Sequence, residues 1–96
     1  PTVSCSSSPG SSLSAGVNYT ITTTVTVSPN TVTGTLVSNE VFLNGSRVST
    51  NNAALDASGQ AFQNFIYTGF VGDNVTIRWE YAGKSCESVF NFISPP

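Results

Sequence analysis

Glycine, lysine and serine follow one another at Gly83-Lys84-Ser85, the order in which a phosphate-binding loop ends. Such a loop wraps the phosphates with backbone amides. It therefore needs another glycine five residues earlier, and a helix must follow to receive the phosphate at its N-terminus. The earlier position is Arg78, inside an alternating strand pattern, and the residues from Cys86 onward alternate as a second strand. The stretch therefore predicts a hairpin turn between two strands and no nucleotide site.

Side chains suited to catalysis are scarce. The chain has no histidine to serve as a general base. Acid–base chemistry by paired carboxylates would have to use the five acidic residues, most of which fall in turns or out of phase with the core: Glu40, Asp56, Asp73, Glu80 and Glu87. Without histidine ligands, Asp56, Asp73 and loop carbonyls offer at most a weak calcium site. We therefore expect no enzyme, no cofactor and no dedicated metal site.

The two cysteines, Cys5 and Cys86, are more informative. In a sandwich whose first strand lies parallel to the last and beside it, the starts of these two strands are neighbours, so a disulfide is geometrically reasonable. It would close a loop of about 80 residues, worth roughly 4 kcal/mol in the chain-entropy model. The alternative is two free, buried thiols. Paired cysteines are typical of an oxidising compartment, which predicts an extracellular or cell-surface location.

The composition narrows the class of partner. The chain has 96 residues, of which only 8% are charged, whereas ordinary soluble domains are about a quarter charged. Ser, Thr and Asn make up more than a third of the chain and must supply its solubility. Three cationic side chains are too few to neutralise a phosphate backbone, which argues against nucleic acid as a partner. No apolar run approaches the length of a membrane span, so any targeting or anchoring segment is expected outside these residues.

The hydrophobic pattern has a period of two residues, as in strands with one face on a core. The alternating segments are residues 18–28, 60–67, 74–83 and 86–93, and the turn signals are residues 44–45, 56–59 and 72–74. Short strands with turn signals every 8–12 residues or so are typical of a β-sandwich. We expect an all-β, Ig-like antiparallel β-sandwich of about seven strands with one disulfide. It should form a single domain over residues 1–93, with 94–96 as a linker or terminal tail.

Two sets of side chains are candidate contact surfaces. In residues 60–70 Phe62 and Ile66 share one face and the opposite face carries further aromatics; one of the two faces must be core. We expect the exposed apolar patch to be Phe65, Tyr67 and Phe70. Trp79 is in phase with the core. The second candidate is the row Thr20, Thr22, Thr24 and Thr26, which could bind ice or sugar or accept O-glycans. A row like this is also what β-propensity with a polar outer face produces.

Three N-x-S/T sequons occur, at Asn18, Asn44 and Asn74. A chain this rich in Asn, Ser and Thr produces about as many by chance, so the sequons alone do not indicate glycosylation. Asn44 and Asn74 fall in predicted turns and are therefore the better positions for a glycan.

Four motifs in residues 32–83 follow one another in a recognisable order: Val32-Thr33-Gly34, Val41-Phe42-Leu43-Asn44-Gly45, Asp56-Ala57-Ser58-Gly59-Gln60-Ala61 and Gly72-Asp73-Asn74-Val75-Thr76-Ile77. In this order they resemble the Ig-like repeat domains of bacterial and archaeal surface proteins. The cysteine pair and the Phe-rich last strand depart from many such repeats. The resemblance implies an extracellular stalk, adhesion or assembly role, with no catalytic residues to carry over.

Together these features predict a non-catalytic structural or interaction module of a cell-surface, appendage, filament or virion surface protein. It would contact other protein domains or subunits, including further copies of itself, through a sheet face or an edge strand. The alternative is a carbohydrate-binding, adhesin-like module that uses exposed, coplanar rings. Neither function calls for nucleic acid or for direct membrane insertion.

Overall fold

The computed structural model describes residues 1–29 and 32–95, so that Pro96 of the predicted tail lies outside the described residues. The described chain is all-β, as predicted, and contains no helix. Its eight strands are β1 (Thr2–Ser8), β2 (Ser12–Ser14), β3 (Asn18–Ser28), β4 (Leu36–Leu43), β5 (Ser46–Ala54), β6 (Gln60–Thr68), β7 (Asn74–Tyr81) and β8 (Lys84–Ile93).

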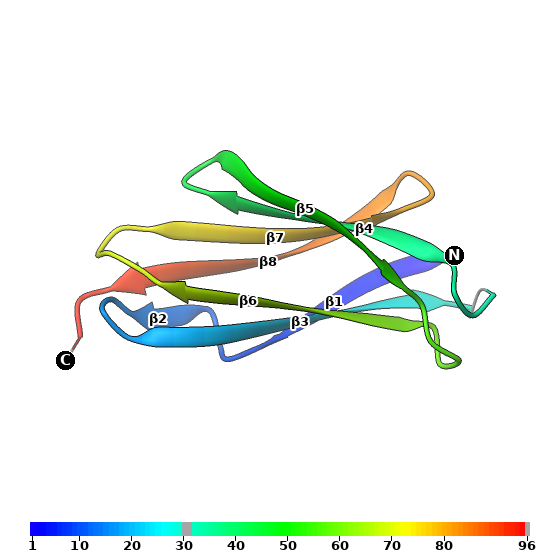
Figure 1. Ribbon diagram of the computed structural model, residues 1–96, viewed down its shortest axis with the longest axis horizontal. Coiled ribbons are helices and arrows are strands. Elements are labelled where there is room, and N and C mark those ends of the chain that lie inside the picture. Colours follow the sequence, from blue (N-terminus) through cyan, green and yellow to red (C-terminus); the bar gives the residue numbers. More distant parts are fainter. Residues whose placement is uncertain (30–31, 96) are drawn as a thin grey trace.

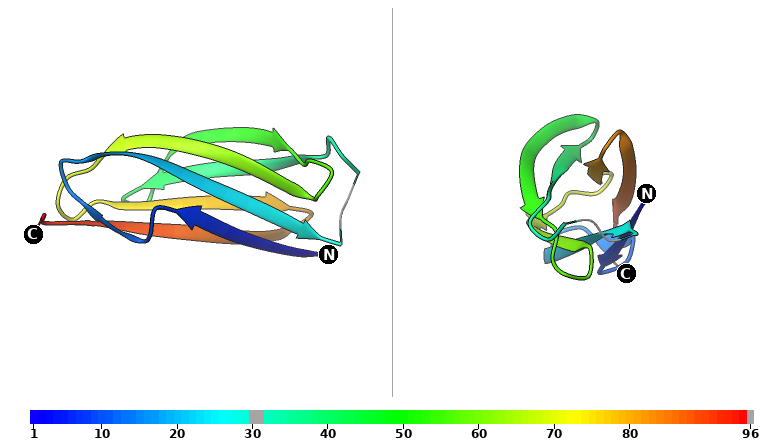
Figure 2. Two further views of the ribbon diagram at one scale, coloured as in Figure 1. Left: turned by 90° about the horizontal axis from the view of Figure 1, so that it is seen from below. Right: turned by 90° about the vertical axis from the view of Figure 1, so that its right-hand side faces the viewer.

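The strands form two sheets that face each other as a sandwich (Figure 1; Figure 2, right). One sheet has three strands in the order β1-β3-β6, and the other has five in the order β2-β8-β7-β4-β5. In the lettering of immunoglobulin-type sandwiches these are A-B-E and A′-G-F-C-C′. The molecule is elongated, 44 × 22 × 18 Å along its principal axes. The predicted Ig-like sandwich with one disulfide is therefore confirmed.

The first strand is divided between the two sheets, which accounts for eight strands where about seven were predicted. β1 pairs antiparallel with β3, and after residues 9–11 the short β2 pairs parallel with β8 in the other sheet. Cys5 lies in β1 and Cys86 in β8, with their Cα atoms 5.7 Å apart. The predicted pair is thus correct but its predicted geometry is wrong, because the bond crosses between the sheets instead of joining neighbouring parallel strands.

Two hairpins have the backbone that their sequences require. Asn44 and Gly45 join β4 to β5 with φ values of 51° and 87°, and Ala82 and Gly83 join β7 to β8 with values of 51° and 79°. Two successive residues of positive φ match the right-handed twist of the flanking strands. Lys84 already belongs to β8, which places the Gly-Lys-Ser stretch in a hairpin, as predicted.

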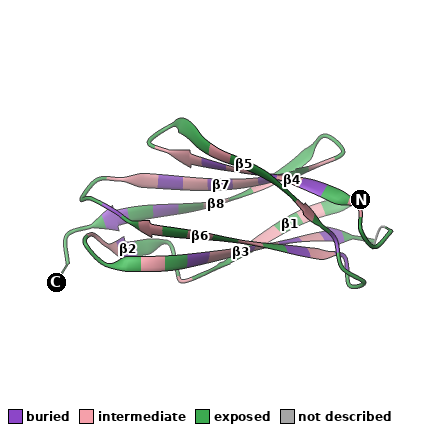
Figure 3. Cartoon of the chain, viewed as in Figure 1, coloured by how far each residue is buried: buried purple, intermediate pink, exposed green. Residues whose placement is uncertain are grey.

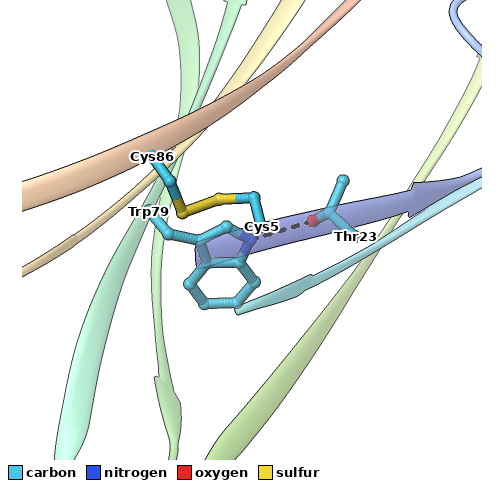
Figure 4. Close-up of a disulfide and its surroundings, with 4 residues drawn as sticks. All are labelled: Cys5, Thr23, Trp79 and Cys86. Carbon is cyan, nitrogen blue, oxygen red and sulfur yellow. Dashed lines mark hydrogen bonds between the residues drawn. A yellow bond between two sulfur atoms is a disulfide. The ribbon is translucent and has the colours of Figure 1, made fainter. Parts of the chain in front are cut away.

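Alternation sets the core, as the burial colouring shows (Figure 3). The inward side chains form two hydrophobic clusters. One contains Leu13, Ile21, Val41, Val75, Ile77, Phe90 and Phe92, and the other contains Val25, Val27, Val37, Leu55, Ala61 and Trp79. Trp79 is fully buried, and its Nε1–H donates to the Thr23 hydroxyl of the opposite sheet at 3.1 Å. The disulfide lies against the same indole (Figure 4). Trp79 is therefore a core residue, as its phase predicted.

Asn39 is a buried polar residue that the sequence pattern did not single out. It lies opposite Trp79 in the β4–β7 ladder and has no exposed surface. Its amide nitrogen and oxygen have no hydrogen-bond partner among the described residues. An unpaired buried amide costs about 1–3 kcal/mol of stability, whereas the paired Thr23 hydroxyl avoids that cost.

Replacing these two buried polar side chains by apolar ones of similar shape should have opposite effects. Asn39→Leu removes two unsatisfied groups and should raise the free energy of unfolding by about 1–3 kcal/mol. Thr23→Val leaves the Trp79 N–H unpaired and should lower it by about 1–3 kcal/mol. Urea titration followed by Trp79 fluorescence measures both. A loss of stability in Asn39→Leu would contradict the assignment of Asn39 as unsatisfied.

Candidate interaction surface

Charge is segregated between the two sheets. Each of the eight charged side chains of the sequence lies outside β1, β3 and β6, the strands of the three-stranded sheet. The outer face of that sheet consists of hydroxyl and amide side chains with two hydrophobic ones. We call it the Ser/Thr face, and its residues are Thr2, Ser4, Ser6, Ser8, Asn18, Thr20, Thr22, Thr24, Thr26, Ser28, Gln60, Phe62, Asn64, Ile66 and Thr68.

The predicted threonine row runs along the centre of this face because β3 is the middle strand. Cross-strand neighbours hold some of its polar groups: the Thr22 hydroxyl donates to Asn64 Oδ1 at 2.9 Å, and Gln60 Nε2 donates to the Thr26 hydroxyl at 3.2 Å. The hydroxyls of Thr20 and Thr24 have no hydrogen-bond partner among the described residues. These two groups, each both a donor and an acceptor, remain available to a partner.

The apolar part of this surface is not the one predicted. Phe62 and Ile66 point outward and are 55% and 65% exposed, whereas Phe65 and Tyr67 point inward and pack on the core. The register explains the reversal, because Phe65 lies opposite the buried Ile21 of β3. The two faces of residues 60–67 carry similar apolar side chains, so alternation alone could not distinguish them. Assignment of Phe65 and Tyr67 to an exposed patch was therefore wrong.

The third residue predicted for that patch, Phe70, is 77% exposed, and it lies after the end of β6. It is adjacent to Val71, which is 62% exposed. The Ser/Thr face and this loop are therefore different parts of the surface.

The five-stranded sheet carries the ion pairs on its outer face. Glu40 of β4 accepts from Arg47 of β5 at 3.1 Å and lies 3.6 Å from Arg78 of β7, which also contacts Glu80 at 3.3 Å. Exposed pairs of this kind contribute about 0–1 kcal/mol each. These pairs matter more for recognition than for stability. They make the outer face of the five-stranded sheet ionic, whereas the outer face of the three-stranded sheet is neutral.

Asp73 organises the loop between β6 and β7. Its carboxylate accepts from the Phe70 amide at 2.9 Å, from Asn44 Nδ2 at 3.1 Å and from the Tyr67 hydroxyl at 2.7 Å. These hydrogen bonds, that from the Phe70 amide foremost, lower the pKa of Asp73. The hydrogen bond to Asp73 raises the pKa of Tyr67. Because Tyr67 points inward, its hydroxyl reaches Asp73 and helps to fix the conformation of this loop.

Asp56 has a separate, local role. It accepts from the hydroxyl and amide of Ser58 and from the amide of Gln60, and the Ser58 hydroxyl is the main cause of its lowered pKa. Strand β6 separates Asp56 from Asp73, so the two residues considered for calcium belong to turns at opposite ends of that strand. Within residues 1–29 and 32–95, no three His, Cys, Asp or Glu side chains are grouped as metal ligands.

The three sequon asparagines differ in what their amides do. Asn44 Nδ2 donates to Asp73, and Asn74 Nδ2 donates to Asn91 Oδ1 at 2.9 Å. Asn18 is exposed and uses only its oxygen, which accepts from the Thr68 hydroxyl at 3.0 Å. N-glycosylation occurs on Nδ2, and of the three sequon asparagines Asn18 is the one whose Nδ2 has no hydrogen-bond partner among the described residues, so we now predict Asn18 as the preferred position.

Comparison with known proteins adds no relative: no family model, no curated protein and no solved structure matches the chain. The described part of the chain has no pocket. It also has no helix of the length and apolar character needed to cross a membrane.

Replacing Asp73 by Asn should remove a pH-dependent part of the stability. The folded pKa lies below the unfolded value of 3.8, so the Asp73 contacts stabilise the fold above that value and are lost as the pH falls through the lowered one. Asp73→Asn should therefore lower the urea midpoint at pH 7 and leave it almost unchanged near pH 2. Glu87→Gln, at a carboxylate that makes no hydrogen bond or ion pair to the described residues, is the control. Equal losses at both pH values would contradict a role for the carboxylate charge.

In a secreting eukaryotic cell, Asn18 should carry the glycan in the folded, secreted protein. A glycan attached to Nδ2 of Asn44 or Asn74 would compete with a hydrogen bond that this nitrogen donates in the native turn. A glycan on Nδ2 of Asn18 would break no such hydrogen bond, because Asn18 uses its oxygen. Peptide mass spectrometry before and after glycosidase treatment measures the occupancy of each site. Thr20→Ala removes the sequon but keeps Asn18 and should abolish the modification. Occupancy of Asn44 or Asn74 with Asn18 empty would reverse the ranking.

Proposed function

We propose that the protein is a non-catalytic, extracellular structural or interaction module of a surface assembly, and that its Ser/Thr face contacts a second copy of the chain. The observation that carries this proposal is the absence of all eight charged residues from the three strands of that face. The disulfide and the resemblance to Ig-like surface repeats support the location, since disulfides persist in oxidising compartments.

A second copy fits this face for two reasons. Hydroxyl groups both donate and accept, so a surface of Ser and Thr is complementary to itself, and two neutral faces meet without like-charge repulsion. A two-fold axis through the face would pair the same residues in both copies. Phe62 and Ile66, exposed on an otherwise polar surface, supply the apolar contact.

The size of the face sets the strength of the contact. Three strands at ~4.8 Å and about nine residues at ~3.3 Å cover roughly 400 Å². A standard interface buries about 800 Å² on each partner, so one pair of faces should bind weakly. Weak contacts become effective when several are linked, as in a filament or a cell-surface array.

Two other contacts compete with this proposal. A neutral glycan could stack on Phe62 and bond to the hydroxyl rows. Phe62 and Phe70, however, are the two strongly exposed aromatic rings among the described residues, and they lie on different elements. The edge strand β5 has nine residues, contains no Pro, and has a single charged side chain, Arg47, which is paired with Glu40. Both contacts are outcomes that the following experiment distinguishes.

Light scattering across a concentration series, on unglycosylated protein because a glycan at Asn18 would lie on this face, should reveal a weak dimer that a charge on the Ser/Thr face abolishes. Thr24→Glu introduces a buried like-charge pair at the centre of the contact and should weaken self-association at least tenfold. Thr76→Glu is the matched control, because Thr76 is equally half-buried in a central strand of the opposite sheet.

A wild-type chain that stays monomeric to millimolar concentration would contradict self-association and direct attention to glycans, tested on a glycan array. A dimer that survives Thr24→Glu would place the contact elsewhere, with β5 as the next strand to change.

A further inference from the structure

The disulfide lies on the shortest covalent path between the two ends of the molecule. Cys5 is four residues after Pro1, and Cys86 is nine residues before Pro95, so the bond closes a loop that holds nearly the whole sandwich. The start of β1 and the end of β8 lie toward opposite ends of the long axis in both side views (Figure 1; Figure 2, left). A pull on these ends would therefore enter through β1 and leave through β8.

We propose that the protein transmits tension along its long axis without unfolding, because the Cys5–Cys86 bond carries the load past residues 6–85. This role goes beyond the proposed contact and does not depend on which partner the Ser/Thr face binds. It requires that the load path be short, that it be extended already in the folded state, and that the load reach it directly.

The length of the path meets the first requirement. The thirteen peptide steps outside the loop reach roughly 45 Å at ~3.3–3.6 Å per residue. With the 5.7 Å between the two cysteine Cα atoms, the stretched path is about 50 Å long, against a long axis of 44 Å. Full extension would thus lengthen the domain by only about 6 Å. A chain of 96 residues without the bond would extend to roughly 330 Å.

Strand β8 meets the second requirement. From Cys86 to Ile93 it is an extended strand, and a strand already spans most of the reach of its residues. It pairs with β7 on one side and ends beside β2 on the other, and Phe90 and Phe92 anchor it in the core. Figure 1 shows it running to the C-terminal end of the molecule.

A contact at the N-terminus meets the third requirement. Lys84 Nζ donates to the carbonyl oxygen of Pro1 at 2.7 Å, which places the point of entry beside the start of β8. The load therefore crosses from β1 to β8 close to where it enters. Strands β3 and β6, which hold most of the Ser/Thr face, lie wholly inside the bypassed loop. The part of the face that β3 and β6 carry therefore lies off the load path, whereas Thr2 and Ser4 of β1 lie on it.

Single-molecule force spectroscopy tests the proposal, with the chain held by its two ends between folded modules of known unfolding length. The oxidised wild type should lengthen by no more than ~10 Å before the flanking modules unfold. Cys5→Ala/Cys86→Ala should show one long step of roughly 290 Å, the difference between the stretched chain and the folded molecule. Non-reducing peptide mapping of the same sample verifies the bond.

A second variant separates load bypass from ordinary stabilisation. Thr23→Val keeps both cysteines but weakens the buried contact between the sheets. If the bond carries the load, oxidised Thr23→Val should resist extension as the wild type does, and should show the long step only after reduction. A Cys5→Ala/Cys86→Ala variant that also shows no long step before the flanking modules unfold would overturn the proposal, because the fold alone would then carry the load.

Discussion

The packing of Trp79 between the two sheets is the contact on which the sandwich depends. The indole is the largest buried side chain, and its N–H reaches Thr23 of the opposite sheet while the disulfide lies against its ring. A chain of 96 residues buries a limited fraction of its surface. Few charges are present to add ionic stabilisation. At this end of the core the two sheets are joined by the Trp79 indole, its hydrogen bond to Thr23 and the disulfide. At the other end they are joined by the rings of Tyr19 and Tyr67 on Phe92 and by the Ser14 amide, which donates to the Tyr19 hydroxyl.

The scarcity of charge has a second consequence, for recognition. A surface made soluble by Ser, Thr and Asn can pack against another neutral surface without burying an unpaired ion. The price is weak protection against edge-to-edge pairing, since charged side chains are the usual block. In this molecule the ion pairs around Glu40 and Arg78 cover the five-stranded sheet and leave the three-stranded sheet bare of charge. The outer faces of the two sheets therefore differ in the kind of partner surface that would be complementary to them, ionic for the five-stranded sheet and neutral for the three-stranded sheet.

Sequence periodicity correctly predicted which strand positions share a face. It could not decide which face of β6 is buried, or in which sheet the first strand lies. Trp79 was assigned to the core because its neighbours at period two are apolar. The faces of β6 could not be distinguished, because Phe62 and Phe65 fall on opposite sides and only the register with β3 decides between them. The pairing of Cys5 with Cys86 followed from their number, but the crossing between sheets depends on the division of the first strand. Asn39 gave no signal, since an asparagine in a strand reads as solvent-facing until its neighbours in three dimensions are known.

The disulfide and the neutral face are linked by chain order. The bond joins residues near the two ends of the sequence, and the central strand β3 of the Ser/Thr face lies between them. A bond between two inner strands would stabilise the same sheets, but it would leave the outer strands exposed to any pull on the ends. A bond between the first and last strands places every inner strand off the load path. Its position therefore has two consequences: it closes one of the longest loops the chain allows, which is the most stabilising choice in the chain-entropy model, and it leaves residues 6–85 off the covalent path between the ends.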